Sequence, residues 1–201
     1  MKPSESDGLL LHAIINFTNT YQSKHLESFR QGLENWGDTW QAVEAVMLSA
    51  AKNLADTLKL ANNQSAPLLS AFIQHSENIH WERTYKSSDT AVDKKLIENY
   101  CFAELVGLLG PFVSDRIRAG IGIWAPGVHY PSHQHLAEEL YIVLAGSAEY
   151  TVGNIQPTIY STGQQVHVPS NTPHGFRTDT EPLVVLYFWQ SGDLRQKSTF
   201  L

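Results

Sequence analysis

Short runs rich in Val, Ile, Tyr and Trp occupy the second half of the chain, and Gly, Pro and Asn residues separate them. The runs cover residues 100–106, 116–125, 139–145, 147–152, 165–168 and 183–190. Strands of this length, bounded by turn-forming residues, are typical of a compact all-β unit. We therefore predict a β-barrel in this half, in which the stretches LAGSAEY and VGNIQP connect strands.

The first half of the chain has the periodicity of helices. Apolar residues recur at three- and four-residue steps at Val43, Val46, Met47, Ala50, Leu54 and Leu58. This spacing predicts one face of a helix over residues 43–61, and Asp38 with Gln41 three residues later resembles a capping box that opens it. Residues 7–34 and 67–79 have the same character. Helices followed by strands predict an α+β chain, with a helical region at 1–95 packed on a β-barrel domain at 96–201.

Length and composition narrow the classes of protein. The 201 residues can bury one sizeable core, and a formal charge of −6 without a cluster of Lys and Arg argues against a nucleic-acid partner. Cys101 is the only cysteine, so no intramolecular disulfide can form, and a reducing cytoplasm is the simplest location. The apolar run LLLHAIINF is too short and too polar to span a bilayer, so we expect no membrane partner.

The stretch HYPSHQHLAEELY, residues 129–141, concentrates histidine, glutamate and tyrosine. Side chains two apart on a strand share a face, so His133, His135, Glu139 and Tyr141 point the same way if their strand is continuous. Burying two imidazoles, a carboxylate and a phenol together is unfavourable unless they bind something. Nitrogen and oxygen ligands of this kind suit one divalent ion of Fe, Mn, Zn, Ni or Co.

A fourth metal ligand is expected from the stretch PSNTPHGF, where His174 follows a turn. His167 is a weaker candidate, because Val166 and Val168 on either side indicate the interior of a strand.

The opposite face of the same strand is apolar. Leu140, Ile142 and Leu144 lie on it by parity, and Glu138 shares that side, where we expect a structural role or an outer contact. Either the N-terminal helices or a second subunit must cover this face, so a homodimer is possible.

The spacing of residues 127–146 resembles the first cupin motif at every defined position: Gly127, His133, His135, Glu139 and Gly146. The second cupin motif fits more loosely. Gly163, Pro169 and His174 match, Asn171 stands where the pattern has glycine, and Thr178 stands where it has asparagine. Asparagine tolerates a left-handed turn conformation better than most residues. The resemblance implies a small antiparallel β-barrel that holds one metal ion through His133, His135, Glu139 and His174.

A narrower resemblance covers roughly residues 80–190. NYCFAELVGLLGPF, followed by GVHYPSHQHLAEELYIVLAGSAEY, is similar to the cupin dimethylsulfoniopropionate lyases, which also carry a helical N-terminal region. The resemblance implies that Tyr141 is the base of a β-elimination that yields dimethyl sulfide and acrylate, and that Tyr130 also lines the catalytic site.

The substrate implied by this resemblance is a small sulfonium carboxylate. A sulfonium cation without hydrogen-bond donors is suited to aromatic faces, for which Tyr130, Trp124 and Trp189 are the candidates, and His129 is a further candidate contact. Two alternatives stay open: a cupin Fe(II) oxygenase that acts on another small carboxylate, and a non-catalytic metal-dependent sensor of small molecules.

Overall fold

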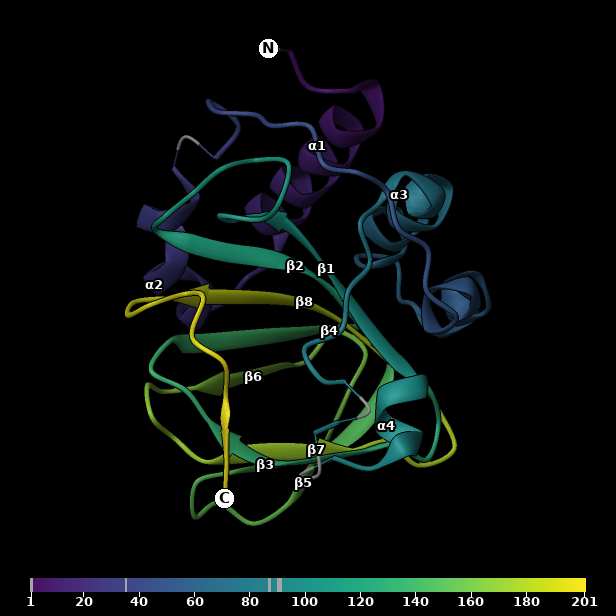
Figure 1. The fold of residues 1–201 in the computed structure, drawn as a ribbon, viewed down its shortest axis with the longest axis vertical. Coiled ribbons are helices and arrows are strands. Elements are labelled where there is room, and N and C mark those ends of the chain that lie inside the picture. The colour runs from purple at the N-terminus through teal and green to yellow at the C-terminus, as the bar shows by residue number, and fades with distance from the viewer. Residues whose placement is uncertain (1, 35, 87, 90–91) are drawn as a thin grey trace.

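The computed structural model describes residues 2–34, 36–86, 88–89 and 92–201. Its helices precede its strands along the chain (Figure 1). The helical elements are α1 (Glu5–Thr20), α2 (Lys24–Leu33), the 3₁₀ helix η1 (Ala50–Leu60), α3 (Ala66–His75), the 3₁₀ turn η2 (Ser76–Asn78) and α4 (Lys94–Glu98). The strands are β1 (Tyr100–Val106), β2 (Ile117–Trp124), β3 (His129–Gln134), β4 (Glu138–Val152), β5 (Thr158–Ser161), β6 (Gln165–Val168), β7 (His174–Arg177), β8 (Leu183–Gln190) and β9 (Thr199–Phe200). None of the helices in these ranges combines the length and the apolar character needed to cross a membrane.

The strands pair antiparallel in the order β1-β2-β8-β4-β7-β3-β9, and β5 and β6 also pair with β4. The first half of β4 pairs with β8 and β6, and its second half pairs with β5 and β7. This single strand therefore passes from one side of the rolled sheet to the other and closes the cupin barrel.

The prediction that LAGSAEY connects two strands is wrong, because these residues lie inside β4. The strand bends there without ending. A β-bulge falls between Val143 and Ala145, and Gly146 has a φ of 78°. A side chain at Gly146 would collide with the carbonyl of Pro182, since its Cβ would lie 1.7 Å from that oxygen. Bulges and glycine together bend a strand while its pairing continues. The other predicted connection, VGNIQP, does follow the end of β4.

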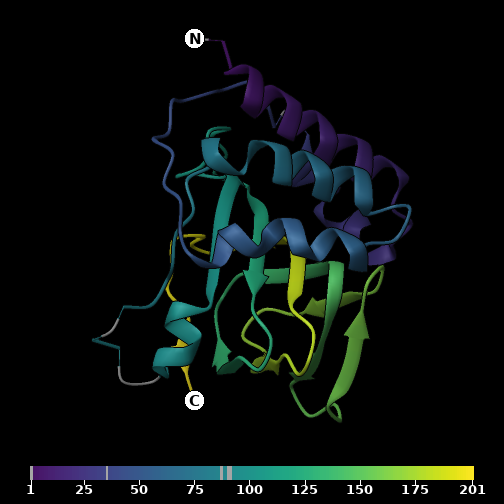
Figure 2. The same cartoon turned by 90° about the vertical axis from the view of Figure 1, so that its right-hand side faces the viewer.

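The two faces of the sheet belong to two different cores. Leu140, Ile142 and Leu144 are fully buried in a cluster that includes residues of α1, α2, η1 and α3. Figure 2 shows these helices stacked against one side of the barrel. Helices of the same chain therefore cover the apolar face. The homodimer and the division of the chain at residue 95 stay predictions.

The helix expected over residues 43–61 begins later than its periodicity indicates. Residues 40–49 contain no helix, and a 3₁₀ helix starts at Ala50. Tertiary partners take the backbone groups of the expected first turns: the Gln41 N–H donates to the Pro111 carbonyl, and the Val46 N–H donates to the Ile79 carbonyl. The capping box at residues 38–41 is therefore wrong. By contrast, residues 7–34 are helical apart from a break between α1 and α2, and α3 with η2 occupies the segment predicted at 67–79.

Candidate metal centre and cavity

Three buried histidines share one local geometry. His133 lies on β3, His174 begins β7 and faces His133 in the sheet register, and His135 lies in the connection between β3 and β4. The Nδ1 atom of each ring lies 2.9 Å from the backbone carbonyl oxygen two residues away along the chain. A carbonyl only accepts, so each Nδ1 carries a proton, and each ring presents its Nε2 atom to whatever lies at the centre of the three.

The Glu139 carboxylate lies among these Nε2 atoms. Its Oε2 atom is 3.0 Å from His135 Nε2 and 3.3 Å from His174 Nε2. Burial alone raises the pKa of Glu139, but the contacts with the two histidines outweigh it and hold the pKa well below its usual range. Burial, with His174 beside it, lowers the pKa of His133 to about 3. At neutral pH the centre therefore combines an anionic carboxylate with a neutral His133 imidazole.

This donor set fits a metal ion. One ring nitrogen from each of His133, His135 and His174 lies within 4.8 Å of the others. Within the described part of the chain, the buried His174 Nε2 makes no hydrogen bond, and an unpaired buried acceptor is unfavourable. A cation coordinated by these nitrogens and by Glu139 would remove that cost. The three histidines could therefore hold a metal ion of the kind that prefers imidazole and carboxylate ligands.

The predicted site assumed one continuous strand, and this assumption is wrong, although His133, His135, His174 and Glu139 do lie close together. A continuous strand from His133 to Tyr141 does not exist, because β3 ends at Gln134 and β4 begins at Glu138. Asn171, at the position of a motif glycine, has a φ of 54°, as its tolerance of the left-handed conformation allows. Thr178 takes a structural role, since its hydroxyl donates to the Ala125 carbonyl at 2.7 Å.

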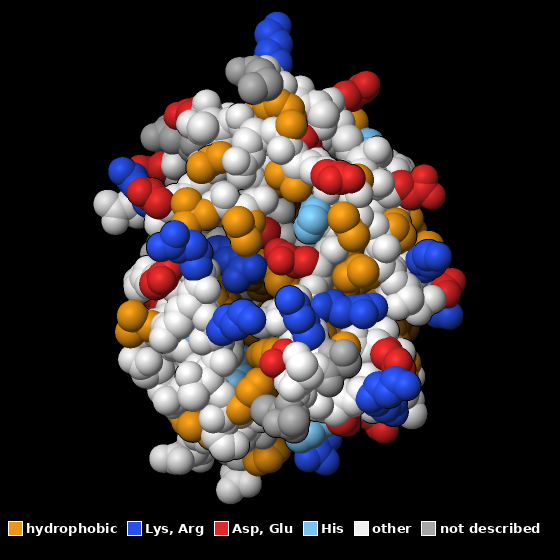
Figure 3. Space-filling model, viewed as in Figure 1, with side chains coloured by type: hydrophobic (Ala, Val, Ile, Leu, Met, Phe, Trp, Pro, Cys, Tyr) orange, Lys and Arg blue, Asp and Glu red, His pale blue; other side chains and the backbone are white. Residues whose placement is uncertain are grey.

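Glu139 and Tyr141 both line a cavity of about 300 Å³, and Glu139 connects it to His135 and His174, which are not among its described lining residues, nor is His133. Tyr130, Trp124 and Trp189 also line it, so these three aromatic candidates border one space. In Figure 3 the molecule is hollowed near the middle of the face shown, with Lys and Arg side chains around the hollow. The Trp189 ring also packs on His135, with ring centroids 4.1 Å apart.

Aromatic side chains form one end of the cavity. The Trp124 ring meets Tyr130 edge to face at 5.9 Å, and the Tyr130 hydroxyl donates to the Tyr85 hydroxyl at 3.2 Å. Gly122 on β2 makes room for Trp124, because a Cβ there would lie 2.5 Å from the indole ring. Trp124 Nε1 is buried without a hydrogen-bond partner among the described residues. This end therefore offers aromatic faces and one free N–H donor.

The structure places His129 and Glu138 away from this space. His129 is exposed on β3, next to the inward-facing Tyr130, and is absent from the described residues that line the cavity. This position gives no support to a substrate contact through His129. Glu138 accepts a hydrogen bond from Gln190 at 2.7 Å and lies 2.6 Å from His167 Nε2, on the side where the sequence placed it. The latter contact gives His167 a structural partner outside the metal centre.

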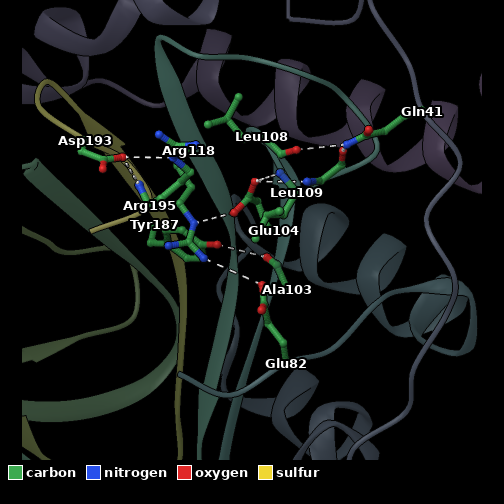
Figure 4. Close-up of polar contacts among 11 residues, drawn as sticks. Gln41, Glu82, Ala103, Glu104, Leu108, Leu109, Arg118, Tyr187, Asp193 and Arg195 are labelled. Atoms are coloured by element: carbon green, nitrogen blue, oxygen red, sulfur yellow. Dashed lines mark hydrogen bonds and ion pairs between the residues drawn. The ribbon is translucent and has the colours of Figure 1, made fainter. Parts of the chain in front are cut away.

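Sequence reasoning missed a charged cluster that also lines the cavity (Figure 4). The buried Glu104 carboxylate accepts from Arg118 Nε at 2.6 Å and from the backbone N–H groups of Leu109 and Gly110 at 2.7 and 3.1 Å. Glu82 lies beyond, with its Oε1 atom 3.8 Å from Arg118 Nη2. The sequence did contain a signal for this cluster. Glu104 is the one charged residue of β1, and Arg118 is the one charged residue of β2. Strand parity places both on the face that bears Tyr100 and Trp124.

Comparisons with known proteins identify the family. A family model described as dimethylsulfoniopropionate lyase matches residues 28–185, which is most of the chain. The chain belongs to this family. Dimethylsulfoniopropionate lyases are carbon–sulfur lyases, so the chain is an enzyme of that class.

Individual dimethylsulfoniopropionate lyases show the same likeness. DddQ of Ruegeria pomeroyi is 34% identical over 156 residues, which are 78% of this chain and 76% of the relative. The crystal structure of this DddQ superimposes with a TM-score of 0.82 at 29% identity and covers 96% of both chains. A chain from crystal structures of the lyases RdDddP and RnDddQII gives a TM-score of 0.85 at 27% identity, over 98% of this chain and 97% of that one. The agreement confirms the predicted cupin barrel with its helical N-terminal region.

Proposed function

We propose that the chain cleaves dimethylsulfoniopropionate to dimethyl sulfide and acrylate, with one divalent metal ion held by His133, His135, Glu139 and His174. The observation that carries this proposal is that Tyr141 and Glu139 border one cavity next to three inward-facing imidazoles, in a member of this lyase family.

The proposed reaction is a β-elimination. A base removes a proton from the carbon next to the carboxylate, the electron pair of that C–H bond forms the C=C bond of acrylate, and the C–S bond breaks with its electron pair going to sulfur. One zwitterion yields neutral dimethyl sulfide, the acrylate anion and one proton. No oxidant and no organic cofactor is needed.

Tyr141 is the proposed base. It lies on β4 two residues after Glu139, and both side chains face into the barrel. Burial, and then the nearby Glu139 carboxylate, raise the pKa of Tyr141 well above its usual value, so the phenol needs a compensating cation to act as a base near neutral pH. A divalent ion at the histidines would supply that positive charge and would polarise the substrate carboxylate. Tyr141 would hold the abstracted proton on its phenol oxygen until the proton is released to water.

Tyr130, Trp124 and Trp189 are the proposed aromatic contacts of the substrate. A sulfonium group has no hydrogen-bond donor, so ring faces are its suitable neutral partners. Burial raises the pKa of Tyr130 well above its usual value, which keeps its hydroxyl protonated as the donor to Tyr85. In this proposal Tyr130 shapes the site and Tyr141 moves the proton.

The test is an anaerobic incubation of the purified chain with dimethylsulfoniopropionate and added Mn(II), Fe(II) or Zn(II). We expect dimethyl sulfide, measured by headspace gas chromatography, and acrylate, measured by liquid chromatography, in equal amounts, and we expect a chelator to stop both. An oxygenase would be silent until oxygen is admitted, and a sensor would be silent throughout. Either of these results with every metal would overturn the proposed substrate.

A further inference from the structure

Glu82 places a poorly compensated carboxylate on the wall of the cavity. Its backbone is held by Phe102, with N–H to carbonyl distances of 2.8 and 3.0 Å in the two directions. Its side chain is 29% exposed. Among the residues drawn in Figure 4, its carboxylate contacts Arg118 alone. The Oε1 to Nη2 distance of 3.8 Å is too long for a hydrogen bond.

The Arg118 guanidinium already forms an ion pair with another carboxylate, that of Glu104. Its Nε atom donates to Glu104 at 2.6 Å, and the side chains of this pair are only 17% and 4% exposed. One guanidinium thus faces two carboxylates, and the cluster of Glu82, Glu104 and Arg118 has one negative charge in excess. Burial raises the pKa of Glu82, Arg118 opposes the rise, Glu104 adds to it, and His80 opposes it to a smaller extent. A ligand cation next to Glu82 would restore the balance of charge.

Aromatic faces border the same part of the cavity. The Arg118 guanidinium carbon lies 5.3 Å from the centre of the Phe102 ring and 5.4 Å from the centre of the Trp189 ring. Tyr187 stands edge-on to Phe102 at 6.3 Å. These ring faces already accept one cation, so the local surface suits a cationic group.

The sheet register connects this cluster to the proposed base. Tyr141, Tyr187, Gly120 and Glu104 are successive neighbours across β4, β8, β2 and β1. Three strand spacings separate the backbones of Tyr141 and Glu104 by about 14 Å. Gly120 has no side chain between them, and the room that a Cβ would need there is taken by the Ala103 carbonyl and the Tyr187 hydroxyl.

We infer that Glu82 is a specificity-determining residue, which attracts the cationic head group of the substrate toward the part of the cavity that Trp189 borders, while the substrate carboxylate lies toward Glu139 and Tyr141. This inference rests on the proposed function and assigns the charge selection within it. Lys86, Arg195 and Lys197 also line the cavity and repel a cation, but they are exposed, so water and salt screen them more strongly than Glu82. The half-buried Arg83 lines it too, and its guanidinium donates to the Tyr100 carbonyl and the Ser49 hydroxyl.

The proposed role of Glu82 predicts how KM and kcat change when its charge is removed. Elimination turns the sulfonium cation into neutral dimethyl sulfide, so the attraction to Glu82 is stronger in the bound substrate than in the transition state. Removing a ground-state interaction of this kind raises KM and leaves kcat unchanged or higher. Glu82→Gln, which keeps the shape of the side chain, is expected to raise KM about tenfold without a fall in kcat.

The decisive experiment measures binding without turnover, by titration calorimetry on the metal-loaded chain. The probes are 3-(trimethylammonio)propionate and 4,4-dimethylpentanoate, which have the same shape and differ by a positive charge on the head group. We expect Glu82→Gln to reduce the preference for the charged probe about tenfold and to leave the affinity for the neutral probe within about twofold. The matched control is Glu77→Gln, which makes the same change at an exposed residue of η2 and is expected to bind both probes like the parent.

Failure of this inference and failure of the proposed function give different results. An unchanged preference in Glu82→Gln, or an equal loss of affinity for both probes, overturns the role of Glu82 even if dimethyl sulfide is released. A Glu82-dependent preference for the charged probe in a chain that releases no dimethyl sulfide keeps the charge selection and overturns the reaction.

Discussion

The replacement Tyr141→Phe tests the proposed base most directly. The change removes one oxygen from a side chain that is 5% exposed, and the ring keeps its packing against Tyr150, 5.7 Å away between centroids. Glu139 retains His135 and His174 as partners. The expected loss of stability is therefore about 1 kcal/mol or less. Loss of a positioned base lowers the rate by roughly 10²- to 10⁴-fold. We expect that fall in the release of dimethyl sulfide, with unchanged metal content and a nearly unchanged melting temperature.

The matched control for this experiment is Tyr150→Phe. Tyr150 lies on the same strand and within the same interior cluster as Tyr141, but its buried hydroxyl makes no hydrogen bond to any described residue. Removing an unpaired buried hydroxyl is neutral or stabilising, and Tyr150 is outside the described lining of the cavity. Its activity is expected to match the parent. The assignment of the base fails if Tyr141→Phe keeps activity within about threefold of the parent, or if both variants lose activity equally.

Three further predictions concern the metal centre and the fold. His135→Ala and Glu139→Ala should each strip the metal while far-ultraviolet circular dichroism stays close to that of the parent, and unchanged metal by elemental analysis in both would refute the ligand assignment. Glu104→Ala should destabilise the chain by roughly 3–5 kcal/mol in urea unfolding, because a buried guanidinium loses its hydrogen-bonded carboxylate and two loop N–H groups lose their acceptor. Glu149→Ala, at an exposed ion pair, should cost about 1 kcal/mol or less, and equal losses in the two variants would contradict this reasoning. Ile142→Ala should cost roughly 2–5 kcal/mol in the same assay, and a loss below about 1 kcal/mol would show that the helices and the barrel do not depend on this shared core.

Features that depend on neighbouring residues could be predicted from the sequence. The parity of β4 is one example: Leu140 and Ile142 face the helices, whereas Tyr141 and Val143 face the interior. The first cupin motif could be recognised for the same reason, since its spacing reflects geometry within one short stretch of chain.

Some strands carried no periodic signal. β3 has the sequence HYPSHQ, which is polar and contains Pro131, and β9 has only two residues. These strands form because partners distant in the sequence supply their hydrogen bonds: His133 faces His174 on β7 and Phe200 on β9. A pattern read along the chain contains no information about such partners.

By itself the sequence determined the helical and β-rich halves, the four candidate ligands and the candidate base, because strand parity and motif spacing are local properties. Only the tertiary structure decided that residues 40–49 are not helical, that β4 bends without ending at Gly146, and that Glu82 joins Glu104 and Arg118 on the cavity wall. The physical reason is common to all three. Backbone groups and charges pair with the partners that folding brings close, and Glu82 meets Arg118 from 36 positions away in the chain (118 − 82), a distance over which no periodicity or propensity acts.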